Sequence, residues 1–161
     1  KKIKGKIGIL PGSANNPSKR WPVGHWRKLI SLLIEENKSF RIYLYGSAKE
    51  SLLASQLLDG FDESIVLNSC GKTNLIELSK ELASCDQVIG NDSGGMHLAN
   101  AVGAPTVVLF GPTNHKVTAP CFDAPLQIIE SSHSLNTNDR NYNLSNLSAV
   151  KVFEKVTTSC K

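Results

Sequence analysis

The segment DQVIGNDSGGMHLANAVGAPTVVLFG, from Asp86 to Gly111, indicates the fold of this chain. It opens with the apolar run DQVIG and closes with a second one, PTVVLFG, whose Val-Val-Leu-Phe core suggests burial on both faces of a sheet. Between them lies SGGMHLANAVG, a short helical pattern that ends at Gly103. A strand, a helix and a strand in this order are typical of a βαβ unit with parallel strands.

The same alternation extends along the chain. Apolar periodicity and turn residues predict strands at 6–12, 40–46, 64–71, 86–92, 104–113 and 126–131, and helices at 24–37, 48–60, 73–85, 93–103 and 146–156. Residues 131–146 are polar and indicate an irregular excursion. Because βαβ crossovers are right-handed, the pattern predicts a Rossmann-like, doubly wound α/β domain with a parallel sheet.

Size and composition limit the class of protein. The 161 residues suit one domain, 1–161, and no apolar run approaches the length of a membrane span. The apolar piece Ile7 to Leu10 is too short for the core of a signal peptide. The four cysteines are irregularly spaced and lack a C-x-x-C pair, so we expect reduced thiols in a cytoplasmic protein.

Positive charge gathers at the start of the chain. Residues 1–41 hold ten Lys or Arg against two Glu, a balance of +8, and the remainder carries −4, for a total of +4. Such a region suits an anionic ligand, an anionic membrane surface or nucleic acid, or simply a solvated surface. Because basic residues interleaved with aromatics are absent beyond KRW, we expect no nucleic-acid partner.

Three strand-to-helix loops contain the candidate site, because doubly wound folds bind ligands beyond the carboxyl ends of their strands. The loop PGSANNPSKRWP, 11–22, offers small residues and Lys19 for an anion but lacks the Walker and dinucleotide glycine patterns. GNDSGGMHLA, 90–99, follows the fourth predicted strand. FGPTNHK, 110–116, resembles an ordinary Gly-Pro turn and ranks below the other two.

The adjacent glycines of the second loop admit two explanations. If the strand ends near Asn91, Asp92 and Ser93 are the natural N-cap residues, and Gly94 and Gly95 lie in the first turn with free N–H groups. Bare backbone there favours an anion site, since two glycines cost a helix about 1 kcal/mol each. Close packing of the helix on a neighbouring strand explains the glycines equally well.

Together, PGSANNPSKRWP, YGSAKE, GKTNLIEL and GNDSGGMHLANAVGAPTVVLFGPT resemble the carboxyl-terminal half of the lipopolysaccharide heptosyltransferases, glycosyltransferase family 9. The resemblance runs from about residue 7 to 120 and is weaker after 124. It implies one half of a GT-B enzyme, whose two Rossmann-like domains face across a cleft. This half would bind ADP-L-glycero-D-manno-heptose, and an amino-terminal acceptor-binding domain would be absent from this chain.

The resemblance also implies roles for individual residues. Lys19 matches the lysine that meets the donor phosphates, and is our catalytic candidate. Ala14 and Asn15 stand where relatives often carry hydroxyls, so Ser13 or backbone groups would replace those contacts. The other positions implied to bind the donor are Asp92, Ser93, Gly94, Gly95 and His97 at the sugar and diphosphate, Thr73, beside Gly71 and Lys72, at the adenine, and Glu50 or Lys49 at the ribose.

Inverting glycosyl transfer needs a base for the acceptor hydroxyl and stabilisation of the departing ADP. The resemblance implies no metal and no cofactor, with the base, an acidic residue, in the other domain. Asp92 would cap the helix and bind sugar hydroxyls, while His97 on residue type alone is equally a core residue or a ligand. We expect the acceptor to be the lipopolysaccharide core, and the resemblance allows peripheral contact with the inner membrane. The alternative to an enzyme domain is a non-catalytic nucleotide-binding module of the same fold.

Overall fold

The computed structural model describes residues 5–13, 19–111, 113–131 and 144–158. Within these ranges six parallel strands form one sheet in the order β3-β2-β1-β4-β5-β6. The strands are β1 Lys6–Leu10, β2 Arg41–Leu44, β3 Val66–Asn68, β4 Gln87–Asn91, β5 Thr106–Phe110 and β6 Leu126–Glu130. The helices are α1 Val23–Glu36, α2 Ser51–Leu58, α3 Leu75–Ala83, α4 Gly94–Ala101, α5 His115–Thr118 and α6 Ala149–Thr158, with 3-10 turns η2 Ala48–Glu50 and η3 Leu144–Asn146.

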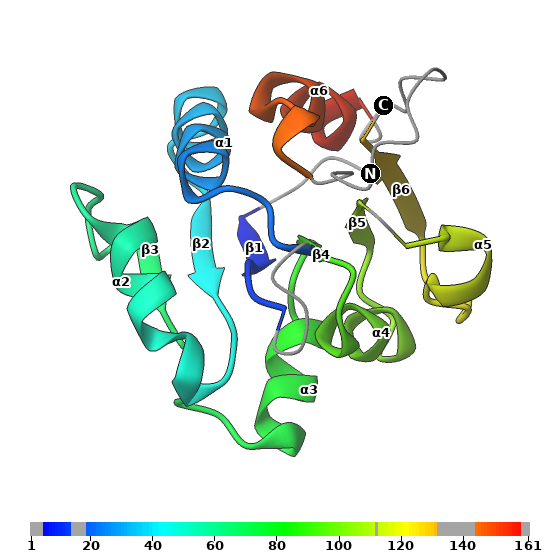
Figure 1. Cartoon of the computed structure of the whole chain (residues 1–161). Coiled ribbons are helices and arrows are strands. Elements are labelled where there is room, and N and C mark those ends of the chain that lie inside the picture. The colour runs from blue at the N-terminus through cyan, green and yellow to red at the C-terminus, as the bar shows by residue number, and fades with distance from the viewer. Residues whose placement is uncertain (1–4, 14–18, 112, 132–143, 159–161) are drawn as a thin grey trace.

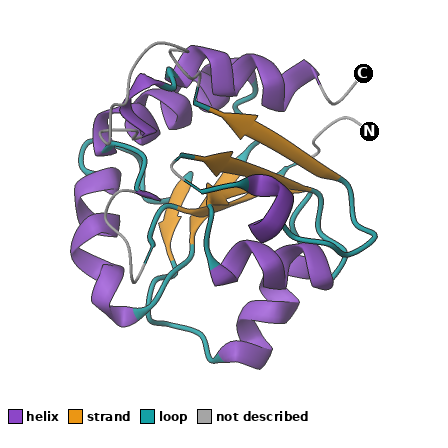
Figure 2. Cartoon of the chain, turned by 45° about the vertical axis from the view of Figure 1, so that its right-hand side comes forward, coloured by secondary structure: helices purple, strands orange, loops and turns teal. Residues whose placement is uncertain are grey.

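This strand order is that of a doubly wound sheet, which confirms the predicted fold class. The chain moves from β1 outward to β3, returns to the other side of β1 with β4, and continues outward to β6. Figure 1 shows α1 and α6 over one face of the sheet and α3 and α4 over the other, and Figure 2 shows the strands as the layer between helices. The sheet therefore divides at β1 and β4, whose onward connections leave over opposite faces.

Two apolar clusters fill the space on either side of the sheet. One, beneath α1, α2 and α6, contains Trp21, Trp26 and the buried aliphatic residues of α1. The other, beneath α3 and α4, contains Tyr45, Met96 and Phe110. All five residues of β5 are buried, as its Val-Val-Leu-Phe run predicts for a strand covered on both faces.

The Asp86 side chain, directly before β4, ties that strand to the start of β1. The Asp86 carboxylate accepts hydrogen bonds from the backbone N–H groups of Gly5, at 2.8 Å, and Lys6, at 3.0 Å. At the other end of the ladder Leu10 pairs with Gly90. A Cβ on Gly90 would lie 3.0 Å from the Leu10 carbonyl oxygen, so the two strands approach closely where they end.

Three local predictions need correction. The third helix begins at Leu75 rather than at residue 73, because the Asn74 side chain is its N-cap and accepts the backbone N–H of Glu77 in a reciprocal capping box. β3 has three residues rather than eight, since a turn at Asp62 accepts the N–H groups of Ile65 and Val66. The short helix α5 was not predicted; the Asn114 side chain caps it through the N–H of Lys116.

The remaining element predictions hold. Gly60 and Gly103, which were expected to end helices, have positive φ angles of 80° and 87°. The sixth strand and the closing helix are present, and residues 132–143 of the polar excursion lie outside the described ranges. None of the helices in the described residues has the length and apolar character that a bilayer span requires.

Candidate functional site

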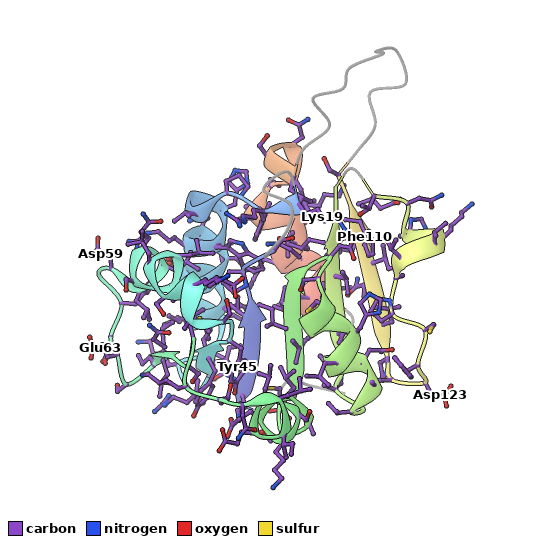
Figure 3. All side chains as sticks on the ribbon, turned by 60° about the horizontal axis from the view of Figure 1, so that its bottom comes forward. Lys19, Tyr45, Asp59, Glu63, Phe110 and Asp123 are labelled. Carbon is purple, nitrogen blue, oxygen red and sulfur yellow. The ribbon has the colours of Figure 1, made fainter. Side chains whose placement is uncertain are left out.

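A cavity of about 380 Å³ opens beyond the carboxyl ends of β1 and β4, where the onward connections of the two strands leave over opposite faces of the sheet. It is lined by Leu10, Gly12, Ser13, Lys19, Tyr45, Ser47, Glu50, Leu78, Asp92, Ser93, Gly94 and Gly95. We call it the switch-point cavity; Figure 3 labels two of its lining residues, Lys19 and Tyr45. Ligands of doubly wound folds bind at this position, beyond the carboxyl ends of the strands.

A larger hollow of about 590 Å³ lies elsewhere, along the outer strand β3. Its lining includes Asp59, Glu63 and Lys72. In Figure 3, Asp59 and Glu63 stand at the rim of the molecule, far from Lys19. This hollow lies beside the sheet and not at its switch point, so size alone does not make it the better candidate.

Three side chains meet at one carboxylate oxygen in the switch-point cavity. Lys19 Nζ donates to Asp92 Oδ2 at 2.6 Å, and Thr113 Oγ1 donates to the same oxygen at 2.7 Å. The Asp92 side chain is only 5% exposed, so the lysine ammonium compensates the cost of burying its charge. The predicted capping role of Asp92 is wrong, because its carboxylate turns to these two donors.

Asn91, the last residue of β4, fixes the loop that carries Lys19. Its side chain is fully buried; Nδ2 donates to the Pro11 carbonyl at 2.6 Å and Oδ1 accepts the Trp21 N–H at 3.2 Å. One amide thus holds both ends of the loop. Arg20 adds two hydrogen bonds to the Ser13 carbonyl, at 2.9 and 3.1 Å, and Ser13 is itself buried.

The two adjacent glycines at the start of α4 differ in their surroundings. A Cβ on Gly95 would meet Leu10 side-chain atoms at 3.0 and 3.1 Å, whereas a Cβ on Gly94 would meet nothing within 4 Å. Gly95 thus serves close packing on β1, and Gly94 leaves the helix N-terminus open to the cavity. Ser93 is the N-cap residue but its side chain makes no capping hydrogen bond.

Glu50 forms the opposite wall of the cavity. Its Oε2 accepts the Ser47 backbone N–H at 2.6 Å and the Ser47 hydroxyl at 2.9 Å, in a capping box at η2. The carboxylate lies directly over Gly12: a Cβ there would be 1.4 Å from Glu50 Oε1. At Gly46 a Cβ would be 2.8 Å from Oε2. Two glycines therefore make the notch that holds this carboxylate.

The structure brings together most of the residues predicted to form the site. Those that line the cavity are Ser13, Lys19, Glu50, Asp92, Ser93, Gly94 and Gly95. Thr73, before the cap of α3, and His97, one turn into α4, do not line it in the described structure, and Asn15 lies outside the described residues. Sequence reasoning missed Thr113 and Asn91, although the GPT turn after a buried strand was the available signal for Thr113.

In the part of the chain that the structure describes, neither the two buried thiols nor the possible metal ligands form a second site. Cys70 and Cys85 are free and buried, and burial raises the pKa of each thiol to about 11, so both are unreactive at neutral pH. No group of three or more His, Cys, Asp or Glu side chains able to hold a metal ion occurs among the described residues. Metal independence therefore stays a prediction.

The chain resembles known proteins in sequence and in structure. It is 39% identical over 120 residues to lipooligosaccharide heptosyltransferase 2 of Haemophilus influenzae, covering 73% of this chain and 34% of that protein. The solved structure of E. coli ADP-heptose lps heptosyltransferase II superposes with a TM-score of 0.81 and 28% identity, covering 98% of this chain and 47% of that one. An E. coli heptosyltransferase with ADP-2-deoxy-2-fluoro heptose gives a TM-score of 0.77 and 26% identity, covering 98% and 44%.

The chain corresponds to only part of its relatives, but one family matches nearly all of it. The chain spans about a third of the length of that curated relative and just under half of the solved chains. The model of glycosyltransferase family 9 (heptosyltransferase) matches residues 1–148, nearly the whole sequence and all of the switch-point cavity. The chain therefore belongs to glycosyltransferase family 9.

Proposed function

We propose that this chain is the donor-binding half of an inverting, metal-independent heptosyltransferase that uses ADP-L-glycero-D-manno-heptose. The observation that carries the proposal is the switch-point cavity, in which Lys19 and the open N-terminus of α4 face the same space. A lysine ammonium and the backbone N–H groups at the start of a helix together suit a diphosphate. The names of the similar solved structures, which include ADP-heptose and an ADP-heptose analogue, support this donor class.

In this proposal, different residues of the cavity bind different groups of the donor. Lys19 and the N–H groups at Ser93, Gly94 and Gly95 hold the diphosphate. The Asp92 carboxylate accepts from hydroxyls of the sugar, and Glu50, with its carboxylate fixed by Ser47, accepts from hydroxyls of the ribose. Thr73 at the adenine, Asn15 at the diphosphate and His97 at the sugar remain predictions of the family resemblance.

The reaction would proceed by direct displacement. The acceptor hydroxyl oxygen forms a bond to the anomeric carbon while the bond from that carbon to the phosphate oxygen breaks, and the hydroxyl proton passes to a base. Lys19 and the α4 N-terminus stabilise the charge that develops on the departing ADP. Asp92 is a poor base, because Oδ2 already accepts from an ammonium and a hydroxyl. We therefore place the base in an amino-terminal partner domain.

That partner domain would also bind the acceptor, the lipopolysaccharide core, and the two halves together would form a GT-B enzyme. We propose action in the cytoplasm with peripheral contact at the inner membrane and no nucleic-acid partner. The excess of Lys and Arg in residues 1–41 suits anionic ligands and anionic surfaces alike.

Calorimetry on the chain tests the donor proposal. We expect ADP and ADP-heptose to bind, ADP-heptose more tightly, and UDP to bind more weakly than ADP. Absence of binding to millimolar ADP-heptose by the folded chain would overturn the proposal. Transfer of heptose to a lipopolysaccharide core acceptor on addition of an amino-terminal family domain would distinguish an enzyme half from a non-catalytic nucleotide-binding module.

A further inference from the structure

The loop after β5 reaches Asp92 from the side opposite to the loop after β1. β4 lies between β1 and β5 in the sheet, and Asp92 extends the β4–β5 pairing by donating its N–H to the Leu109 carbonyl at 3.2 Å. Lys19 comes from the connection after β1 and Thr113 from the connection after β5. The Asp92 carboxylate is thus held from both flanking strands.

The two donors are chemically unequal. Lys19 carries a charge, and a diphosphate in the cavity competes with Asp92 for that charge. Thr113 is neutral, and its single hydroxyl proton is already given to Oδ2 at 2.7 Å. A bound diphosphate would therefore interact with the Lys19 ammonium and leave the hydrogen bond from Thr113 to Asp92 intact.

The Thr113 loop is fixed independently of the cavity. The next residue, Asn114, caps α5 through the N–H of Lys116 at 3.0 Å. His115 Nδ1 contacts the Glu130 carboxylate at the end of β6, and its ring packs edge-on against Phe110 with centroids 6.0 Å apart. These contacts hold the hydroxyl of Thr113 against Asp92 without help from a ligand.

We propose that Thr113 is a positioning residue, which keeps the Asp92 carboxylate in place for the sugar of the donor while Lys19 engages the diphosphate. This role rests on the proposed function of the switch-point cavity. Both donors use Oδ2, and in this arrangement the other carboxylate oxygen, Oδ1, accepts a sugar hydroxyl.

Binding of ADP and of ADP-heptose to matched variants tests this role. Thr113→Val keeps the shape and removes the hydroxyl, and Thr113→Ser keeps the hydroxyl. Thr118→Val is the control, because Thr118 is a threonine of the same segment whose hydroxyl donates to the Asn114 carbonyl, at 3.3 Å, and not to Asp92. We expect Thr113→Val to weaken ADP-heptose binding about tenfold, the value of a hydrogen bond to a charged group, and ADP binding less than about threefold.

Rescue separates positioning from general packing. Thr113→Ser is expected to restore most of the ADP-heptose affinity, and Thr118→Val to match the wild type. In the ligand-free chain, the urea midpoints of Thr113→Val, Asp92→Asn and the double variant are expected to be non-additive.

Three results would overturn the positioning role: unchanged ADP-heptose affinity in Thr113→Val, equal losses for ADP and ADP-heptose, or no rescue by serine. Each requires a wild-type chain that binds both ligands. A wild type that binds neither ligand overturns the proposed function instead, and the positioning role with it.

Discussion

The two carboxylates of the switch-point cavity are held in different ways. Asp92 is buried against a lysine and a threonine that reach it from two other loops. Glu50 is held by the backbone and hydroxyl of Ser47, three residues away, and by the lack of side chains at Gly12 and Gly46. One wall of the cavity therefore depends on charge and tertiary contacts, and the other on local backbone and volume.

The two walls of the cavity are therefore expected to respond to different kinds of substitution. A substitution that removes charge harms the Asp92 wall, since a buried carboxylate without its cation is costly. A substitution that adds volume harms the Glu50 wall, since its carboxylate occupies space that a side chain on Gly12 would fill.

Removal of the cation is expected to have the largest effect. Lys19→Ala takes away the charge proposed to meet the diphosphate, and we expect ADP affinity to fall about 10- to 100-fold, as for loss of a charge-assisted hydrogen bond. The urea midpoint should also decrease, because Asp92 stays buried. Lys38→Ala, an exposed lysine after α1, is the control. Equal ADP affinity in both variants would remove the distinction between the two walls.

Added volume at Gly12 is expected to have the next largest effect. In Gly12→Ala the new methyl occupies the place of Glu50 Oε1, so the carboxylate must turn away. We expect a loss of ADP affinity of about fivefold, the value of a single hydrogen bond, equal to that of Glu50→Gln.

Gly24→Ala is the matched control for Gly12→Ala, because a Cβ at Gly24 meets nothing within 4 Å. Calorimetry and urea denaturation on both variants give the comparison. If Gly12→Ala and Glu50→Gln had additive effects in the double variant, the notch would not act through Glu50.

The glycine pair of α4 offers a comparison within one wall. Gly94→Ala is expected to leave stability unchanged or slightly higher and to weaken ADP-heptose binding, because the methyl projects into open space at the helix start. Gly95→Ala is expected to lower the free energy of unfolding by about 1 kcal/mol through contact with Leu10. Urea denaturation and calorimetry on both variants check the assignment; the reverse pattern would exchange the two roles.

The smallest expected effect on stability concerns Glu81, a carboxylate outside the switch-point cavity. Glu81 Oε2 accepts hydrogen bonds from Lys6 Nζ at 2.5 Å and from the Tyr45 hydroxyl at 3.0 Å. As at Asp92, a lysine and a hydroxyl donate to one carboxylate oxygen, but the Glu81 side chain is 43% exposed. The hydrogen bond from Lys6, with that from Tyr45, lowers the pKa of Glu81. At such exposure we expect less than about 1 kcal/mol of stabilisation.

The sign of this effect with pH follows from the lowered pKa. The stabilisation by Glu81 is present above its unfolded pKa of about 4.3 and is lost as pH falls through the lower folded value. The difference in unfolding free energy between wild type and Glu81→Gln should therefore be constant from pH 7 to 5 and shrink below pH 4. A difference that grew on acidification would contradict the assignment.

The sequence predicts what is local and misses what depends on tertiary pairing. Turn residues and apolar periods indicated the parallel sheet and the loops that carry Lys19 and Gly94. The hydrogen bond between Thr113 and Asp92 joins residues 21 apart, and those of Asn91 join residues 70 and 80 apart. Neither leaves a local pattern. Asp92 was misassigned as a cap because two distant donors outweigh a local N–H.

The position of Asn91 affects how the chain folds. Its amide joins two ends of a loop that the chain makes some 70 to 80 residues earlier. Contacts so distant in sequence require closure of a long loop and form slowly compared with local helices. The βαβ unit of β2 and β3 can form without them, but Lys19 and Asp92 meet only after β4 has inserted beside β1. The proposed donor site is therefore expected to form late in folding, and a nascent chain that ends before β4 would lack it.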